Sequence, residues 1–236
     1  GYFVRDINRS GAEVYVRALD FARAGLDAQS VDDVRDAPDG AVLLRGRLGA
    51  LDYRSNTRAL LVAEAWRALP GVEGRAGDVV YRIDRGAACV GLPCPRWRAT
   101  RVNVGSFASF HELLASVEVS PWLDRAWLLQ EAYTRGALVL GATRRVRSYY
   151  TVLDASQVFL RLPQRAACRT PSVAACPAGQ SRSFSRGLDR CLTPGACVTP
   201  GACDAVPVAC PEGYIARRWA DASGCTAAVC DPAFAR

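Results

Sequence analysis

The stretch GAVLLRG, residues 40–46, recurs further along the chain as GALVLG, residues 136–141. Both stretches open with glycine and alanine, continue with a run of large aliphatic residues and close with glycine. The closing glycines, Gly46 and Gly141, are 95 residues apart. A short apolar run bounded by glycines is typical of a buried strand. The recurrence therefore suggests that one strand-containing unit occurs twice.

Two more pairs of segments match in the same order and at nearly the same offset. They are YFVRDIN with WRATRVN, residues 2–8 and 97–103, and AWRALP with VFLRLP, residues 65–70 and 158–163. Three ordered matches indicate an internal repeat, and two copies favour a tandem pair of small units over a solenoid. We expect the first unit at 1–70, a glycine-rich linker at 71–78, the second unit at 79–165 and a tail at 166–236.

Each copy combines strand-like and helical patterns. Apolar or alternating segments predict strands at 14–19, 41–48, 59–69, 79–83, 96–103, 137–140 and 148–162. In the second copy, Ser109 to Glu112 reads as a capping box and Ser120-Pro121 as a second helix start. In the first copy the possible helix cap is Ser30 to Asp33. Residues 14–19 are strand-like where the second copy is helical, so one of these two interpretations is wrong.

The resulting expectation is an α+β fold: two tandem copies of a small β-rich unit with short helices, then an irregular, disulfide-rich tail. The second copy opens with a strand at 79–83 that has no counterpart before residue 2. The chain also lacks methionine. We therefore expect the first copy to be truncated at its N-terminus by one strand, with a signal peptide removed or missing.

The cysteines indicate the compartment. There are ten: Cys89, Cys94, Cys168, Cys176, Cys191, Cys197, Cys203, Cys210, Cys225 and Cys230. The last eight lie in the tail. No Cys-x-x-Cys occurs and the single histidine is far from the tail, which argues against zinc. We expect a local Cys89–Cys94 disulfide and pairing of the tail cysteines among themselves, in a connectivity left open. Disulfides persist outside the reducing cytosol, so the sequence predicts an extracytoplasmic protein, secreted or on the cell surface.

The net charge of +7 comes from arginine alone, because lysine is absent. Arginines are spread along the whole chain, whereas a nucleic-acid binder gathers its cations and mixes in stacking aromatics. We therefore expect no nucleic-acid partner. No stretch approaches the ~18 uncharged apolar residues of a spanning helix, so no transmembrane segment is expected. The densest groups are interpreted as polar strand faces: Arg96, Arg98 and Arg101, then Arg144, Arg145 and Arg147.

No catalytic, cofactor-binding or metal-binding motif stands out. His111 lies inside the capping box and is interpreted as a surface helical residue. Asp32-Asp33 could bind a metal, but carboxylates at a helix start are the favoured interpretation. Four tryptophans could form a carbohydrate platform, although core packing is preferred for them: Trp66, Trp97, Trp122 and Trp127.

Residues 81–103 also carry a resemblance. YRIDRGAACVGLPCP, residues 81–95, has two cysteines enclosing a proline, and the next strand-like segment ends at Asn103. This pattern, with GYFV at 1–4 and EAWRA at 64–68, resembles an uncharacterised family of secreted bacterial proteins known only as a domain of unknown function. The resemblance covers about residues 1–163 and implies no activity. CPEGY at 210–214 is similar to the opening of small secreted cysteine-rich modules, including inhibitor-like ones.

These observations favour a non-enzymatic secreted or cell-surface protein that binds a partner or has a structural role. The partner is unknown. The alternative is a protease inhibitor that acts through a tail loop held by disulfides, because a rigid loop binds with little loss of entropy. An enzyme is the least favoured class, since no constellation of catalytic residues is visible.

Overall fold

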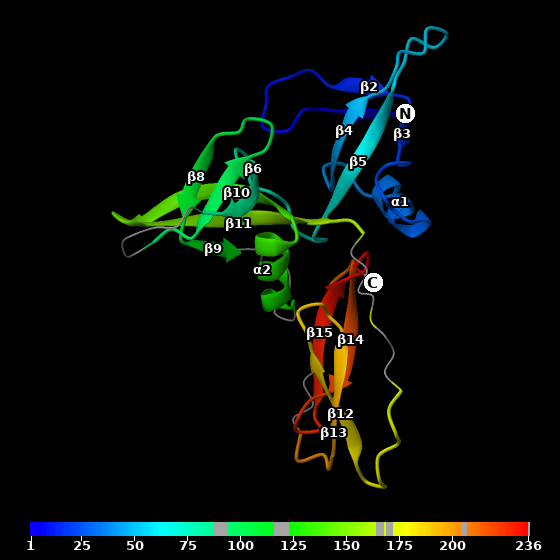
Figure 1. The fold of residues 1–236 in the computed structure, drawn as a ribbon, viewed down its shortest axis with the longest axis vertical. Helices are drawn as coiled ribbons and strands as arrows, with labels where there is room; N and C mark the ends of the chain where they lie inside the picture. The colour runs from blue at the N-terminus through cyan, green and yellow to red at the C-terminus, as the bar shows by residue number, and fades with distance from the viewer. Residues whose placement is uncertain (87–93, 116–122, 164–167, 169–171, 204–206, 236) are drawn as a thin grey trace. The chain divides into compact units, whose positions relative to one another are not determined.

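The computed structural model describes residues 1–236 except 87–93, 116–122, 164–167, 169–171, 204–206 and 236 (Figure 1). The chain divides into two compact units. Unit 1 comprises residues 1–118 and 131–163, and unit 2 comprises 119–130 and 164–236. The described part is β-rich, with two short helices and a disulfide-rich C-terminal region. None of its helices is long and apolar enough to cross a membrane.

Unit 1 is built on a nine-stranded sheet. In the order β3-β5-β11-β10-β6-β7-β8 each strand pairs with its neighbours, β4 also pairs with β5, and β9 also pairs with β11. A separate two-stranded sheet joins β1 and β2. The bounds are β1 Tyr2–Val4, β2 Val14–Val16, β3 Ala18–Asp20, β4 Val42–Leu48, β5 Ala59–Ala68, β6 Val79–Arg85, β7 Trp97–Arg101, β8 Phe107–Phe110, β9 Glu112–Ala115, β10 Leu138–Arg147 and β11 Tyr150–Arg161.

The centre of the sheet forms the core because its strands are buried on both faces. In β11, the residues from Ala155 to Leu160 are all buried, as expected for a strand covered on both sides. One cluster joins Trp66 and Ala68 of β5 to Val80, Leu138 and Phe159. Trp66 also donates a hydrogen bond from Nε1 to the Gly136 carbonyl, at 2.8 Å, so its polar atom is satisfied in the core.

The same order of six elements occurs twice in the chain. β1, β2, β3, helix α1 (Ala28–Arg35), β4 and β5 are followed, after β6, by β7, β8, β9, helix α2 (Arg125–Thr134), β10 and β11. β3 pairs parallel to β5, and β9 pairs parallel to β11. The β4–β5 and β10–β11 hairpins each have a register shift beside a glycine, Gly46 or Gly141. At both glycines an added Cβ would meet a backbone oxygen of the partner strand, at 2.4 Å and 2.3 Å respectively.

Where β5 and β11 meet, the contacts are symmetric. The Leu69 N–H donates to the Val158 carbonyl at 3.0 Å, and the Leu162 N–H donates to the Ala65 carbonyl at 2.9 Å. Leu69 and Leu162 occupy matching places in the two six-element series, and so do Ala65 and Val158. The strands therefore pair as two like elements around a local twofold axis.

Two asparagines repeat this symmetry. Asn8 and Asn103 both have positive φ, 58° and 61°, a region that asparagine enters more readily than most residues. The Asn8 Nδ2 donates to the Val102 carbonyl at 3.0 Å, and the Asn103 Nδ2 donates to the Ile7 carbonyl at 3.3 Å. Each asparagine thus holds the chain segment that precedes the other.

The helix expected from the capping box at Ser109 to Glu112 is absent, and that prediction is wrong. Ser109 and Phe110 belong to β8 and Glu112 to β9, and the His111 N–H between them donates to the Thr151 carbonyl at 2.8 Å. Pairing with β7 and β11 outweighs the local capping pattern, since tertiary contacts override propensity. The strand interpretation of residues 14–19 agrees with β2 and β3.

The helix starts also differ from the expected ones. Helix α1 begins at Ala28, and its cap is Asp27, whose Oδ1 accepts from the Ser30 N–H at 2.8 Å. Helix α2 begins at Arg125, and the Trp127 N–H donates to Asp124 Oδ1 at 3.0 Å. Both caps are aspartates, which rank among the preferred N-cap residues. Ser120-Pro121 lies outside the described residues.

Unit 2 contains two hairpins, so the tail is more regular than expected. They are β12 (Ser181–Arg186) with β13 (Leu192–Val198), and β14 (Tyr214–Ala220) with β15 (Thr226–Pro232). In each hairpin module, the first cysteine bonds the third and the second bonds the fourth. The bridges are Cys168–Cys191, Cys176–Cys197, Cys203–Cys225 and Cys210–Cys230.

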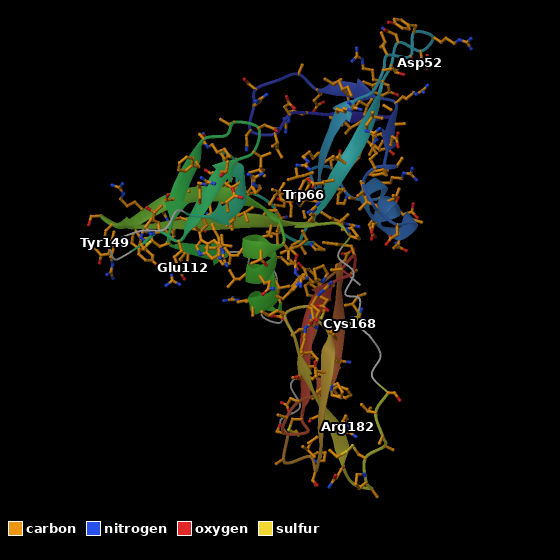
Figure 2. All side chains as sticks on the ribbon, in the orientation of Figure 1. Asp52, Trp66, Glu112, Tyr149, Cys168 and Arg182 are labelled. Atoms are coloured by element: carbon orange, nitrogen blue, oxygen red, sulfur yellow. A yellow bond between two sulfur atoms is a disulfide. The ribbon has the colours of Figure 1, made fainter. Side chains whose placement is uncertain are left out.

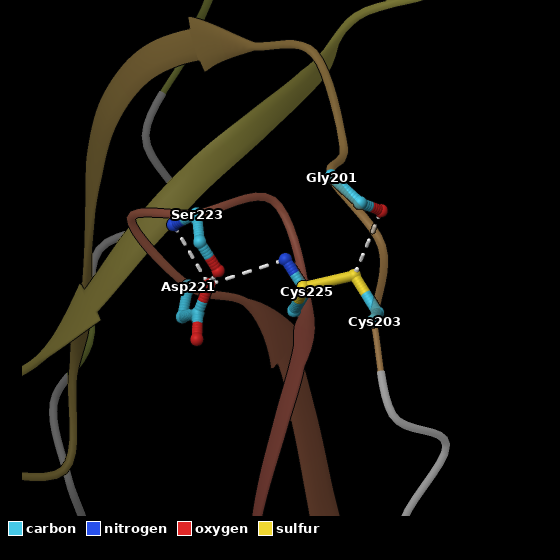
Figure 3. Close-up of a disulfide and its surroundings, with 5 residues drawn as sticks. All are labelled: Gly201, Cys203, Asp221, Ser223 and Cys225. Carbon is cyan, nitrogen blue, oxygen red and sulfur yellow. Dashed lines mark hydrogen bonds between the residues drawn. A yellow bond between two sulfur atoms is a disulfide. The ribbon is translucent and has the colours of Figure 1, made fainter.

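The turn of the second hairpin is held beside one of these bridges. Asp221 Oδ1 accepts from the N–H groups of Ser223, at 2.8 Å, and Cys225, at 3.1 Å, next to the Cys203–Cys225 disulfide (Figure 3). A hydrogen bond from the Ser223 hydroxyl, and then those from the Ser223 and Cys225 N–H groups, lower the pKa of the Asp221 carboxyl. In the first hairpin, Asp189 Oδ1 accepts from the Cys191 N–H in the same way, at 3.0 Å.

Candidate binding surface

The long β10–β11 hairpin extends beyond its neighbour in the sheet. β6 pairs only with the first part of β10, from Leu138 to Gly141, whereas the β10–β11 ladder continues to Arg147 and Tyr150. Residues 142–151 therefore project past β6 (Figure 1). This projecting part contains the exposed arginines Arg144, Arg145 and Arg147.

A fourth arginine, from a different strand, lies beside this projection. Arg101, at the end of β7, lines a hollow of about 210 Å³ together with Thr143 of β10. The remaining lining residues are Tyr81, Ser106, Phe107 and Ala108. Arg145 follows Thr143 on the same face of β10, because side chains two apart on a strand share a face. One residue of the first dense arginine group, Arg101, thus lines the hollow beside the strand that carries the other group.

Exposed aromatic side chains accompany these arginines. Phe107 is 62% exposed and Tyr149 is 55% exposed, and Tyr149 lies at the end of the hairpin (Figure 2). The Arg98 guanidinium lies 5.2 Å from the Phe107 ring centroid, a cation–π contact. We call the set Arg101, Phe107, Arg144, Arg145, Arg147 and Tyr149 the basic end.

The arginines of the basic end lack acidic neighbours within the described part of the chain. Elsewhere in unit 1, arginines pair closely with carboxylates: Arg45 contacts Glu64 at 2.7 Å and Arg67 contacts Asp33 at 3.1 Å. No such ion pair involves Arg101, Arg144, Arg145 or Arg147 among the described residues. Their guanidinium groups, which bind carboxylates in a two-pronged geometry, are therefore available to a partner.

His111 is used within the sheet. Its ring lies between β8 and β9, stacks on Tyr150 at 4.5 Å between centroids, and accepts a hydrogen bond at Nδ1 from the Thr151 N–H at 3.1 Å. The interpretation of His111 as a surface helical residue is wrong, because the residue is half-buried and outside any helix. Because its Nδ1 accepts a hydrogen bond from a strand N–H, His111 has a structural role.

Tyr150 and Glu112 form a hydrogen bond near the same end of the hairpin. The Tyr150 hydroxyl donates to Glu112 Oε2 at 3.1 Å. Desolvation, and then the hydrogen bond to Glu112, raises the pKa of the Tyr150 phenol. The raised pKa keeps the Tyr150 phenol protonated at neutral pH.

Asp32 and Asp33 do not lie at a helix start. Helix α1 begins at Ala28, so both residues are in its second turn. Asp33 pairs with Arg67 of β5, and Asp32 lies 3.9 Å from Arg35. The helix-start interpretation is wrong, and Asp33 instead contributes to holding α1 against the sheet.

The tryptophans do not form one exposed platform. Trp66 is 7% exposed and Trp127 is fully buried. Trp97 is half-buried and stacks on Tyr133 at 4.0 Å between centroids. Trp122 lies outside the described residues. The preference for core packing fits the placement of Trp66 and Trp127.

The remaining candidate residues are cysteines. The eight tail cysteines form the four bridges given above. Cys94 is disulfide-bonded, and Cys89 lies outside the described residues. In the part of the chain that the structure describes, no group of three or more histidine, cysteine or acidic side chains is placed to hold a metal ion.

Unit 2 has a buried ionic cluster that sequence reasoning did not identify. Arg186 of β12, with a side chain 6% exposed, contacts Asp231 of β15 at 2.7 Å and Asp124 at 3.3 Å. Its guanidinium lies 5.8 Å from the Trp219 ring centroid. Charges buried and paired in this way join the two hairpins to the start of α2 and are not free for a ligand.

Comparison with known proteins gives one match. A family model described as "Domain of unknown function (DUF6748)" matches residues 1–162. No curated protein and no solved structure matches the chain.

Proposed function

This chain belongs to the DUF6748 family, whose description states no activity, and from its own surfaces we propose that it is an extracytoplasmic, non-enzymatic binding protein whose basic end takes an acidic partner. The observation that carries the proposal is a set of exposed arginines, without ion pairs among the described residues, on the projecting end of β10 and at the adjacent end of β7, with two exposed aromatic rings. Arginine and aromatic residues are enriched at binding interfaces. Charge-assisted hydrogen bonds from arginine to carboxylates are among the strong ones.

The compartment follows from the covalent framework. The described residues contain four disulfides within unit 2, and such bridges are typical of an oxidising environment. Secretion is the route we propose. A non-enzymatic role is supported by the use of His111, Tyr150 and Glu112 in bonds within the fold.

We also propose that unit 1 arose by duplication of one ancestral unit. The support is the repeated order of six elements, the matched hairpin glycines Gly46 and Gly141, and the paired asparagines Asn8 and Asn103. Because the two halves share an architecture, differences between them point to what each half has acquired. The basic end belongs to the second half, although the β4–β5 hairpin also carries exposed arginines, Arg45 and Arg47.

The proposal is tested by removing the charge of the basic end. The variant combines Arg144→Gln, Arg145→Gln and Arg147→Gln, and the matched control combines Gln at three exposed arginines of the first half, Arg5, Arg9 and Arg23. Both variants have the same net charge. Binding to immobilised poly-glutamate is measured at low and physiological salt, because exposed charges are screened by salt.

We expect the basic-end variant to bind at least tenfold more weakly than the control, with a smaller dependence on salt. Equal loss in the two variants would show that net charge alone attracts the polymer, and the basic end would be rejected as a site. Turnover of any substrate by the purified protein in a broad hydrolase screen would reject the non-enzymatic role.

A protease inhibitor remains a second candidate because one exposed segment is fixed at both ends. Residues 199–202 are exposed and lie between Cys197 and Cys203, which are bridged to Cys176 and Cys225. A loop constrained in this way binds with a low entropic cost. Inhibition assays against serine and cysteine proteases, with disulfides intact, test it; absence of inhibition removes the candidate.

A further inference from the structure

We propose that the edge between β1 and β4 is a docking slot for an extended partner strand from outside residues 1–236, which would take the place that β6 takes in the second half. The slot is distinct from the basic end, so the two proposals stand or fall separately. Adding a strand to an exposed sheet edge is a common mode of peptide recognition.

The pairing of β6 in the second half shows which strand has no counterpart in the first half. It pairs antiparallel with β10 on one side, from Leu138 to Gly141, and with β7 on the other, from Trp97 to Arg101. The matching strands of the first half are β4 and β1. Among the described residues, β4 pairs only with β5 and β1 pairs only with β2. The pairing partners of β6 therefore have counterparts, whereas β6 itself has none.

The burial of matching residues differs in the way that a missing strand predicts. Beneath β6, Leu138 is 5% exposed and Val139 is fully buried, whereas their counterparts Leu43 and Leu44 are half-buried. Gly141 is buried and Gly46 is exposed. The slot thus leaves apolar residues of β4 in contact with water, a liability at a sheet edge.

The β1–β2 side of the slot also exposes large apolar side chains. Phe3 is 71% exposed, Tyr15 46% and Val14 43%. Phe3 and Tyr15 contact each other edge to face, with ring centroids 5.4 Å apart. The matching residues of the second half, Arg98 and Ser109, are polar. Neighbouring exposed apolar residues of this kind mark interaction sites more often than solvated surface.

Asn103 can hydrogen-bond the backbone of the occupant, as Asn8 bonds β6. β6 of the second half is held by Asn8: the Asn8 Nδ2 donates to the Val80 carbonyl at 2.7 Å, and Asn8 Oδ1 accepts from the Val80 N–H at 2.9 Å. Asn103 is the counterpart of Asn8. Its carboxamide bonds the Ile7 carbonyl and makes no equivalent pair of bonds to a strand among the described residues. The same two backbone bonds are therefore available to a strand in the slot.

These features specify the occupant. It is an extended segment that runs antiparallel to β4 and places an apolar residue at the position of Val80, as in VVYRIDR of β6. A second copy of the chain is a poorer fit, because β6 is already paired on both edges. The occupant is accordingly an extended strand from outside residues 1–236 that carries this apolar pattern.

The test uses a synthetic peptide with the sequence of residues 78–86, DVVYRIDRG, and a scrambled peptide as control. Binding to the full chain is measured by fluorescence anisotropy, and amide hydrogen exchange is followed in β4. We expect the native peptide alone to bind and to slow exchange of the amides from Leu43 to Gly46. Absence of binding, or equal binding of the scrambled peptide, overturns the proposal.

Two glycine variants identify the contact. Asn103→Gly keeps the backbone at positive φ and removes the carboxamide, and Asn56→Gly is the matched control at another positive-φ asparagine, φ 52°. We expect at least tenfold weaker peptide binding for Asn103→Gly and none of this loss for Asn56→Gly. Equal affinities overturn the assigned contact. Concentration-dependent dimerisation that protects β4 without peptide would assign the slot to a second copy and overturn the proposal.

Discussion

Asn8 should carry far more stability than its counterpart Asn103. The Asn8 carboxamide makes three hydrogen bonds, two with the Val80 backbone at 2.7 and 2.9 Å and one with the Val102 carbonyl at 3.0 Å. Asn103 makes one, to Ile7 at 3.3 Å. Replacement of each by glycine removes the side chain and leaves the positive φ unstrained.

The expected magnitudes follow from counting these bonds. At about 1 kcal/mol of net stability for each hydrogen bond, Asn8→Gly costs about 3 kcal/mol and Asn103→Gly at most about 1 kcal/mol. Glycine also gives the unfolded chain more freedom, but this effect is the same for both variants and cancels in their comparison. The predicted difference is therefore about 2 kcal/mol in the free energy of unfolding.

Urea unfolding with intact disulfides measures the difference, and hydrogen exchange of the Val80 amide localises it. We expect that amide to lose protection in Asn8→Gly and to keep it in Asn103→Gly. If the two variants lose the same stability, the side chain of Asn8 does not secure β6, and the reasoning that treats Asn103 as an unfilled counterpart fails with it.

Three further outcomes are expected. Gly141→Ala should destabilise unit 1 by about 1–3 kcal/mol in urea unfolding, because the new Cβ would lie 2.3 Å from the Asp154 carbonyl oxygen; an unchanged midpoint would contradict this. The pKa of Asp221 is lowered in the folded state, so its contribution to the hairpin turn is complete above the ordinary pKa of 3.8 and is lost as the pH falls through the folded pKa. The protection of the Cys225 amide against hydrogen exchange should therefore be constant from neutral pH down to 3.8 and decrease below the folded pKa; a decrease between neutral pH and 3.8 would contradict this. Replacing Cys203 and Cys225 together by alanine should cost unit 2 about 3 kcal/mol, seen as faster proteolysis of the tail with β6 amide protection unchanged.

Much of unit 1 is predictable from local patterns. The apolar runs at residues 42–48 and 59–68 are strands in the structure, as are those at 79–85 and 150–161. Their apolar patterns agree with their pairing in the sheet. The recurrence of glycine at positions 46 and 141 indicated like strands, and both glycines lie at a register shift of the ladder.

The errors arise where a local signal competes with distant partners. Ser109 to Glu112 has the spacing of a capping box, yet β7 and β11 provide strand partners that no local window contains. The basic end was beyond prediction for a related reason. Arg101 and Arg145 belong to separate runs of the sequence, and the pairing of β6 with both β7 and β10 brings their strands into one sheet, where Arg101 and Thr143 line one hollow.

The way in which the tail bridges are connected limits how far this segment can stretch under a pulling force. A force applied across Cys168 and Cys230 would travel through the Cys168–Cys191 bridge, along the chain to Cys203, through the Cys203–Cys225 bridge and on to Cys230. That covalent route has roughly 17 residue steps and two bridges, 5.2 and 5.5 Å between Cα atoms, and reaches about 70 Å when taut, against about 200 Å for the same segment without its bridges. Even with every strand pulled apart, the tail would behave as a short, nearly inextensible tether.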